Sequence, residues 1–217
     1  MSFVKSLEEL INNDEPGIDL VRQWVESAKN HCEVLPPSPQ CDDVLLKAQV
    51  TTRSPMGAIA HQTGGILIDH GWLRFLGSGH SNLTRTLPDW NDNRADGFYL
   101  VADDMAGGFF AQNGGAFDDD VGVAYFWSPD EFDWESMEMG YSDLLYWALN
   151  EDFSKFYDGL RWDSWKTDIA TLSGDQCMMF YPFPWAEESS AENSYRGAVP
   201  ITEAFDLKCD MVKQLGQ

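Results

Sequence analysis

The sequence predicts an α+β fold in which helices flank a mostly antiparallel sheet. Apolar residues recur at helical spacing on either side of the middle of the chain, whereas the middle itself holds short runs rich in aromatic and β-branched residues. These runs recur about every 8–12 residues between glycine- and aspartate-rich turns, a pattern typical of an antiparallel meander. The chain has 217 residues, of which 43% are hydrophobic, so we expect residues 1–217 to form a single domain with a sizeable core.

The N-terminal segment, residues 1–35, is expected to be a helical arm. Ser6 and Glu9 form a capping-box pattern for a short helix that continues through Ile11. A second helix is expected over residues 18–30, because an apolar stripe runs along it: Leu20, Val21, Trp24, Val25 and Ala28. The Pro-rich residues 36–39 should be stiff and extended, and we interpret them as a linker between this arm and the main α+β body, residues 40–217.

The main body is expected to alternate short helices with strands. Helices are predicted over residues 44–50 and 54–61, followed by two strands, or one bulged strand, over 66–68 and 72–76. Residues 81–96 are polar and predict a loop. Strands are then predicted over 98–102, 108–111 and 121–127. Further helices follow over 143–149, with Ser142 as N-cap, and over 152–157 and 164–172, before a last strand over 177–181.

The charge of the chain restricts the classes of partner. Its formal net charge is −22 and its pI is about 4.2. Binding to nucleic acid or to an anionic membrane needs clustered Lys and Arg, so we expect neither partner. The four cysteines, Cys32, Cys41, Cys177 and Cys209, form no CxxC pair and no zinc spacing, and no secretory or membrane-spanning segment is visible. We therefore expect a cytoplasmic protein with free thiols and without a metal or other cofactor.

The acidic residues are concentrated in one part of the chain. Residues 95–154 contain fourteen Asp and Glu residues and no Lys or Arg. Because aromatic residues are interspersed with them, we expect a folded body that carries an acidic surface patch instead of a disordered acidic tail. Polar and aromatic residues in and near this segment are the candidate binding residues: Trp72, Arg74, Asp89, Trp90, Asp103, Asp104, Asn113, Asp118, Asp119 and Asp120.

Asp69, His70 and Arg74 are the candidates for chemistry. A catalytic centre would bring these groups together near the turn at Asp103 and Asp104. The alternative is that they are ordinary structural residues. Arg74 in particular lies close to a Trp, as does Arg161, and in so acidic a chain each is expected to form a buried or half-buried ion pair, with an anion clamp as the other possibility.

Several strings of residues resemble known families. Residues 64–74 (GGILIDHGWLR), 107–115 (GGFFAQNGG) and 156–162 (FYDGLRW) resemble a bacterial family of uncharacterised proteins of about this length, which carries no assigned activity. More weakly, Gly107–Gly108, Tyr125–Phe126 and Trp134–Glu135, followed by a helix near Ser142, are similar to the middle of the SUKH superfamily. That resemblance implies a SUKH-like α+β fold and a role like that of bacterial immunity proteins, which bind and neutralise toxins, many of them nucleases.

The leading hypothesis is an acidic, immunity-like binding protein whose acidic surface engages a basic protein partner. Nucleases bind phosphate and are therefore basic, so an acidic inhibitor is physically sensible. The alternative is a small hydrolase-type enzyme with a pocket around Asp69, His70 and Arg74. A third hypothesis is an oligomeric module built on the aromatic segments 162–165 and 180–185. The sequence itself makes no prediction of the oligomeric state.

Overall fold

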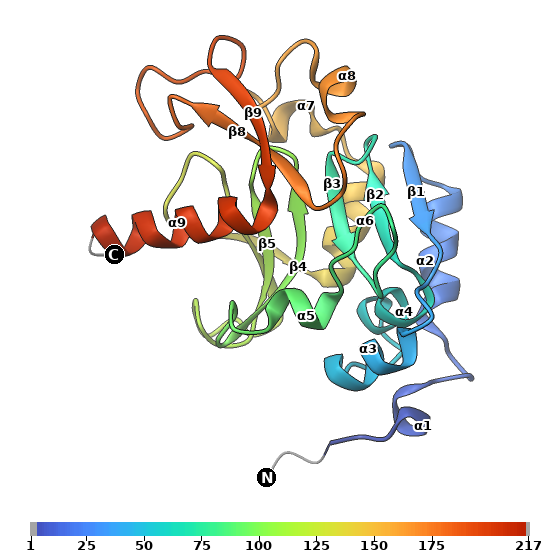
Figure 1. Ribbon diagram of the computed structural model, residues 1–217. Helices are drawn as coiled ribbons and strands as arrows, with labels where there is room; N and C mark the ends of the chain where they lie inside the picture. Colours follow the sequence, from blue (N-terminus) through green and yellow to red (C-terminus); the bar gives the residue numbers. More distant parts are fainter. Residues whose placement is uncertain (1–3, 216–217) are drawn as a thin grey trace.

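The computed structural model describes residues 4–215 and contains a seven-stranded sheet and a two-stranded sheet. The strands of the large sheet follow one another in chain order, and every neighbouring pair is antiparallel (Figure 1). They are β1 (Cys32–Leu35), β2 (Gly65–Ile68), β3 (Leu73–Leu76), β4 (Phe98–Asp104), β5 (Phe109–Asn113), β6 (Val123–Trp127) and β7 (Glu135–Gly140). The predicted antiparallel meander and the α+β class are therefore confirmed.

Helices cover both faces of this sheet, and the small sheet packs at one end of it (Figure 1). The helices before and within the meander are α1 (Leu7–Leu10), α2 (Gly17–Glu26), α3 (Cys41–Ala48), α4 (Pro55–Gln62) and α5 (Leu87–Asn91). Those that follow it are α6 (Tyr141–Asn150), α7 (Phe153–Phe156), α8 (Trp165–Ile169) and α9 (Ile201–Leu215). Strands β8 (Gln176–Tyr181) and β9 (Tyr195–Pro200) pair antiparallel as the small sheet.

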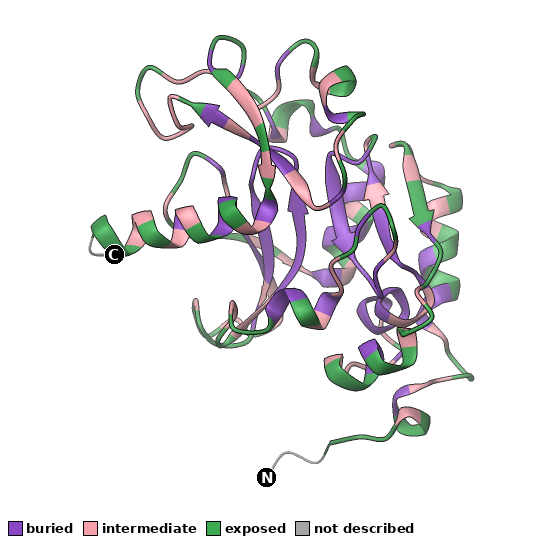
Figure 2. Cartoon of the chain, in the orientation of Figure 1, coloured by how far each residue is buried: buried purple, intermediate pink, exposed green. Residues whose placement is uncertain are grey.

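Two neighbouring residues of β5 show how the sheet is covered on both faces. Successive side chains of a strand point to opposite faces. Accordingly, the ring of Phe109 packs on Phe205 of α9, with 5.0 Å between centroids, whereas Phe110 packs on Phe126 and Phe156 on the other face. The central strands β3 and β4 are consequently buried along nearly their whole length (Figure 2). Burial of successive residues, which point to opposite faces, is expected of strands covered on both sides.

The N-terminal segment is part of the large sheet. Residues 32–35, which were expected within a helical arm, form the edge strand β1, with Cys32 opposite Ile68 and Leu35 opposite Gly65. The expected helix over residues 18–30 ends at Glu26, and the following loop is held by bonds from the Lys29 and Asn30 backbone N–H groups to the carbonyl of Leu149. A strand of only four residues, two of them exposed, gives little periodic signal in the sequence.

Other predicted elements also differ from those observed. The polar segment 81–96 contains the helix α5, because Thr86 caps it and Pro88 lies in its first turn. The N-cap of α6 is Gly140 and not Ser142. The strand at residues 176–181 is not the last, since β9 and the long helix α9 follow it, and β7 was not predicted. Within residues 4–215, no helix has the length and apolar character needed to cross a bilayer.

Candidate functional site

The acidic segment 95–154 carries carboxylates that are almost all unpaired. Among its fourteen acidic residues, only Asp103 forms an ion pair with a Lys or Arg within the described part of the chain. Apart from Asp103, the acids of this segment therefore form no direct ion pair with Lys or Arg in the described residues. The negative charge predicted from the sequence is present at the surface, with the exception of two buried residues described below.

Three half-buried aromatic rings gather several of these carboxylates at one place on the surface. The centroids of Phe98 and Phe117 are 5.0 Å apart, and the ring of Trp134 lies 5.6 Å from Phe98 and 4.9 Å from Phe117. The rings come from the start of β4, the β5–β6 loop and the β6–β7 loop, so their contact places three loops side by side. Five exposed acids lie within two residues of these rings, and we call them the acidic face: Asp96, Asp118, Asp119, Asp133 and Glu135.

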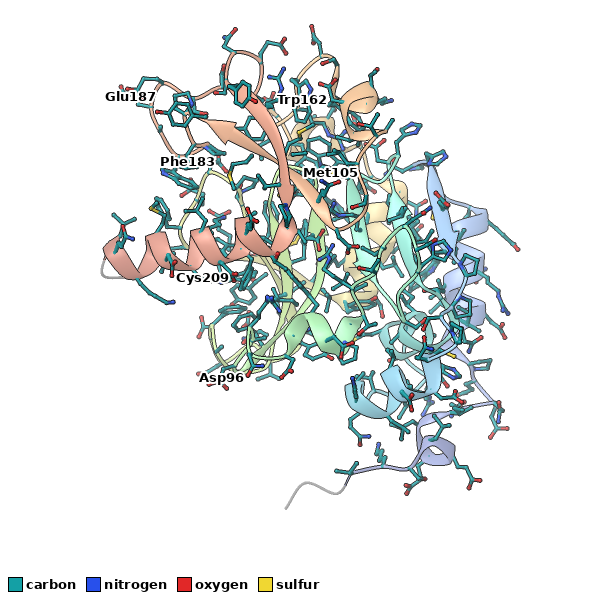
Figure 3. The ribbon with its side chains drawn as sticks, in the orientation of Figure 1. Asp96, Met105, Trp162, Phe183, Glu187 and Cys209 are labelled. Carbon is teal, nitrogen blue, oxygen red and sulfur yellow. The ribbon has the colours of Figure 1, made fainter. Side chains whose placement is uncertain are left out.

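Figure 3 shows where the acidic face lies in the molecule. Asp96 is at the lower end of the view, beside the loops at that end of the large sheet, and Trp162 is at the opposite end, near the small sheet. Other exposed acids of the segment lie further from the rings in the chain: Asp130 and Glu131 in the β6–β7 loop, Glu138 in β7, and Asp143, Glu151 and Asp152 in α6 or the residues that follow it. The acidic face is therefore smaller than the whole segment and is centred on the ring cluster.

The β5–β6 loop is held rigidly behind the acidic face. The Asn113 side chain donates to the carbonyl of Asp118 and to the Asp120 carboxylate, both at 2.8 Å, and it accepts a bond from the Gly115 backbone N–H. The Tyr125 hydroxyl also donates to Asp120, at 3.0 Å. Asn113, predicted as a binding residue, is buried and organises the loop, while Asp118 and Asp119 remain exposed.

Four other predicted binding residues lie inside the protein and not on its surface. Trp72, Arg74, Asp103 and Asp104 all have 0% exposure. Arg74 lies opposite Asp103 in the β3–β4 register, and its Nε donates to the Asp103 carboxylate at 2.6 Å. Asp103 and Asp104 end a strand that is buried on both faces, so their charge is directed into the interior. The prediction that they belong to the acidic surface is therefore wrong.

The Asp103 carboxylate is shared between two arginines. Arg85 donates to it through Nη1 at 2.5 Å and pairs through Nε with Asp175 at 3.0 Å. Arg74 also donates to the carbonyl oxygens of Asp104 and Gln176. This network joins the large sheet to the start of β8. Its contacts show a structural role, since every charged group in it has a partner within the protein.

Asp104 is the second buried carboxylate. Its Oδ1 accepts bonds from the backbone N–H groups of Ala106 and Gly108, at 2.9 and 2.8 Å, and so closes the β4–β5 turn. Among the described residues, no hydrogen-bond partner is present for its Oδ2, nor for the nearby Trp72 Nε1 and Tyr157 hydroxyl. Burial raises the pKa of Asp104 to about 6, against the lowering effect of the Gly108 N–H and Arg74.

The candidate catalytic residues do not form one set of contacts. Asp69 and His70 occupy the β2–β3 turn with φ of 50° and 62°, which is the left-handed geometry of a type I′ hairpin turn. Asp69 pairs with Arg161 at 2.7 Å, and the His70 ring stacks on His31 with 4.5 Å between centroids. Within residues 4–215, no hydrogen bond or ion pair joins Asp69 or His70 to Arg74, which is committed to Asp103. The hydrolase pocket therefore lacks its expected assembly.

Arg161, and not Arg74, forms the ion pair with Asp69. Its guanidinium lies 4.5 Å from the Trp72 ring and 4.3 Å from the Trp165 ring, and its side chain is 16% exposed. The interpretation of Arg74 and Arg161 as buried and half-buried ion pairs is thus confirmed. Burial, followed by His31 and Lys166, lowers the pKa of the neighbouring His70.

A groove of about 780 Å³ lies beside the Pro-rich segment. Its walls are residues 37–40, the groove-facing side of α3, and the loop from Ser78 to Thr86. Lys47 and Asp89 form an ion pair at its edge, at 2.9 Å. Asp89, a predicted binding residue, is exposed. The adjacent Trp90, also predicted to bind, is buried instead. The guanidinium groups of Arg85 and Arg94 each lie 4.6 Å from its ring.

The three rings of the acidic face are not among the residues predicted to bind a partner. A sequence signal was present, because Phe117 directly precedes Asp118 and Trp134 lies between Asp133 and Glu135. In an extended segment neighbouring side chains point to opposite sides, so the acids can be exposed while the rings are half-buried. Fold and site together define an α+β protein with a helix-covered antiparallel meander and an acidic face built around aromatic rings.

Comparison with known proteins places this chain in a family. A family model described as "Protein of unknown function DUF2625" matches residues 7–204, and the chain belongs to this family. It is 37% identical over 221 residues to the putative uncharacterized protein YbfG of Escherichia coli K12, an alignment that covers 99% of this chain and all of the relative. It is 39% identical over 187 residues to an uncharacterized protein of Haemophilus influenzae, with 82% of each chain covered.

These relatives confirm the resemblance to a bacterial family of uncharacterised proteins. No solved structure matches the chain. None of the matches above is to the SUKH superfamily, so the SUKH-like fold stays a prediction.

Proposed function

We propose that this protein binds a basic protein partner through the acidic face. The observation that carries the proposal is that five exposed carboxylates, none of them paired with a Lys or Arg, surround rings that touch each other. A Lys or Arg of a partner could pair with a carboxylate and also lie against the face of a ring. The combination suits a cationic protein surface better than a bare metal ion.

The electrostatics of the chain support the same partner class. With a net charge of −22, it repels anionic ligands and accelerates encounters with cationic ones. Proteins that bind nucleic acid present clustered Lys and Arg, so an immunity-like protein directed against a nuclease would need a surface of this sign. The described thiols are all free, which fits the proposed cytoplasmic location.

Two variants of equal charge test the proposal. The first neutralises the acidic face with D96N, D118N, D119N, D133N and E135Q, and the second neutralises five exposed acids elsewhere with E26Q, E33Q, D158N, E187Q and E188Q. Immobilised wild type and variants are exposed to extract of the source bacterium at low and high NaCl. Bound proteins are identified by mass spectrometry and the retained one is purified for titration.

The expected partner is basic, and it binds wild type less tightly as NaCl rises. Five rim charges of a few tenths of a kcal/mol each predict that the acidic-face variant binds about 10- to 100-fold more weakly. The second variant should bind nearly as well as wild type. Equal weakening of both variants would show that only net charge matters, and a partner that is not basic would refute the proposal.

A further inference from the structure

Three potential metal ligands meet where α3 and α4 pack together. Cys41 and Asp42 lie in the first turn of α3, and His61 lies in the last turn of α4. Each of the three residues offers one donor atom, and these atoms all lie within 4.8 Å of one another. None of them takes part in the acidic face, the buried ion network or the hairpin turn at Asp69.

The two nitrogens of His61 have different surroundings. Nε2 lies 2.7 Å from the Asp42 carboxylate, while Nδ1 is buried and has no hydrogen-bond partner. A buried ring nitrogen normally has a partner, because leaving it bare costs its hydration. The Asp42 carboxylate lies on the Nε2 side of the ring, so Nε2 is the nitrogen that can share an ion with Asp42. Nδ1 would then be left to an outer-shell partner, the position that a carboxylate or carbonyl fills in known metal sites.

The donor types and their spacing select the metal. Thiol sulfur, imidazole nitrogen and carboxylate oxygen together are zinc ligands, whereas Mg²⁺ and Ca²⁺ prefer oxygen alone. Bonds of about 2.0–2.3 Å in tetrahedral geometry place donors about 3.3–3.7 Å apart. That spacing lies within the 4.8 Å that encloses these atoms, and the 2.7 Å contact between His61 and Asp42 would have to lengthen if both bound the ion.

We propose that Cys41, Asp42 and His61 bind one zinc ion. Three protein ligands leave a fourth position for water, and the Asp42 side chain, 60% exposed, keeps the site in contact with solvent. The sequence shows no zinc spacing because nineteen residues separate Asp42 from His61.

Metal-free full-length protein titrated with Co²⁺ and then with Zn²⁺ tests the site. Co²⁺ bound to a thiolate gives a sulfur-to-metal absorption band in the near ultraviolet, which reports directly on Cys41. We expect one equivalent of Co²⁺ to bind with this band and one equivalent of Zn²⁺ to displace it. Affinity should fall at lower pH, since the ligands must lose their protons to bind.

Matched variants separate this site from general effects of substitution. C41S should lose the absorption band, and C41S and H61Q should each weaken Zn²⁺ binding by more than about 100-fold, since even outer-shell changes cost 10- to 100-fold. C209S, which alters a half-buried thiol on α9, and D43N, which alters the acid next to Asp42, should leave binding unchanged. Circular dichroism of every variant shows whether it is folded.

Two results would overturn the proposal. One is that folded wild-type protein binds less than one equivalent of Zn²⁺ at micromolar concentration. The other is that it binds Zn²⁺ with the same affinity after C41S, which would place the metal elsewhere. Rapid alkylation of Cys41 in metal-free protein, unaffected by added Zn²⁺, would instead identify a free reactive thiol and count equally against the site.

Discussion

Arg74 and Asp103 lie directly opposite each other on strands β3 and β4, and neither side chain is exposed to solvent. The Asp103 carboxylate is shared with Arg85, so one negative charge lies between two guanidinium groups. Asp175 pairs with the outer side of Arg85 and completes an alternating chain of charges. An interior ionic network of this kind is stable only while every member is present.

Replacing Asp103 by Ala should therefore be strongly destabilising. The change leaves Arg74 buried without its carboxylate, so we expect the free energy of unfolding to fall by about 3–5 kcal/mol. Urea unfolding followed by tryptophan fluorescence measures it. D119A, at an exposed and unpaired position, is the control and should change stability by less than about 0.5 kcal/mol. If D103A lowered the free energy of unfolding no more than D119A does, the ionic network would contribute nothing to the stability of the fold.

Asp104 should make stability depend on pH in an unusual direction. Its folded-state pKa is about 6, whereas an unfolded Asp has a pKa of about 3.9. The folded protein therefore retains a proton between these values that the unfolded chain has lost. By linkage, the contribution of Asp104 is fully present below pH 4 and is lost as pH rises through about 6, by an amount on the order of 3 kcal/mol.

D104N isolates this effect from the other carboxylates. Asn stays neutral, and its oxygen can still accept the N–H bonds of Ala106 and Gly108. We expect D104N to gain stability relative to wild type between pH 4 and pH 7, in urea titrations at each pH. The control D143N, at an exposed helix position, should differ from wild type by a nearly constant amount. A difference for D104N that does not change with pH would contradict the raised pKa.

The acidic face should make the protein more stable in salt. Carboxylates gathered around Phe98, Phe117 and Trp134 repel one another, and the screening length of about 8 Å at 0.15 M ionic strength covers such separations. We expect the urea midpoint of wild type to rise with NaCl. Neutralising the five acids of the face should reduce this dependence more than neutralising the five dispersed control acids. Equal salt dependence of the two variants would show that the face is no denser in charge than the rest of the surface.

The sequence predicted several parts of the fold that have strong local patterns, but not the 15-residue helix α9. The strands around residues 98–127 and the helices near residues 44–61 were recognised because apolar periods and glycine turns define them locally. Strand β1 and strand β7 were missed, since each is a sheet edge with exposed residues and little periodicity. Their existence depends on pairing with β2 and β6, which is a tertiary effect.

In the candidate site, the sequence does not predict the direction of side chains or the contacts between distant segments. Charge counts predict how much acid a segment carries, but they do not predict which way a side chain points. Asp103 and Asp104 were assigned to the surface for that reason, and the partner of Asp103, Arg74, lies 29 residues earlier in the chain, where a local pattern does not reveal it. Contacts between distant segments, such as Phe117 with Trp134 or Asp42 with His61, likewise follow from the folded chain alone.

Arg161 should stabilise the β2–β3 turn through its rings as well as through its charge. Its guanidinium lies against the rings of both Trp72 and Trp165 and pairs with Asp69, a turn residue that holds a left-handed φ of 50°. Lys at this position would keep the charge but lose the planar stacking surface. We expect R161K to lower the free energy of unfolding by about 1–2 kcal/mol, and R161A by about 2–3 kcal/mol.

A double-mutant cycle of R161A and D69N separates the stabilisation that Arg161 gains from the Trp72 and Trp165 rings from the stabilisation that it gains from its ion pair with Asp69. If stacking dominates, D69N alone should cost less than R161A, and R161A should remain damaging in the D69N background. The control K166A removes an exposed cation that lies 5.3 Å from the Trp165 ring, and it should cost less than about 0.5 kcal/mol. If R161A became harmless once Asp69 was neutral, the ion pair alone would hold the turn, and the rings of Trp72 and Trp165 would serve only as core.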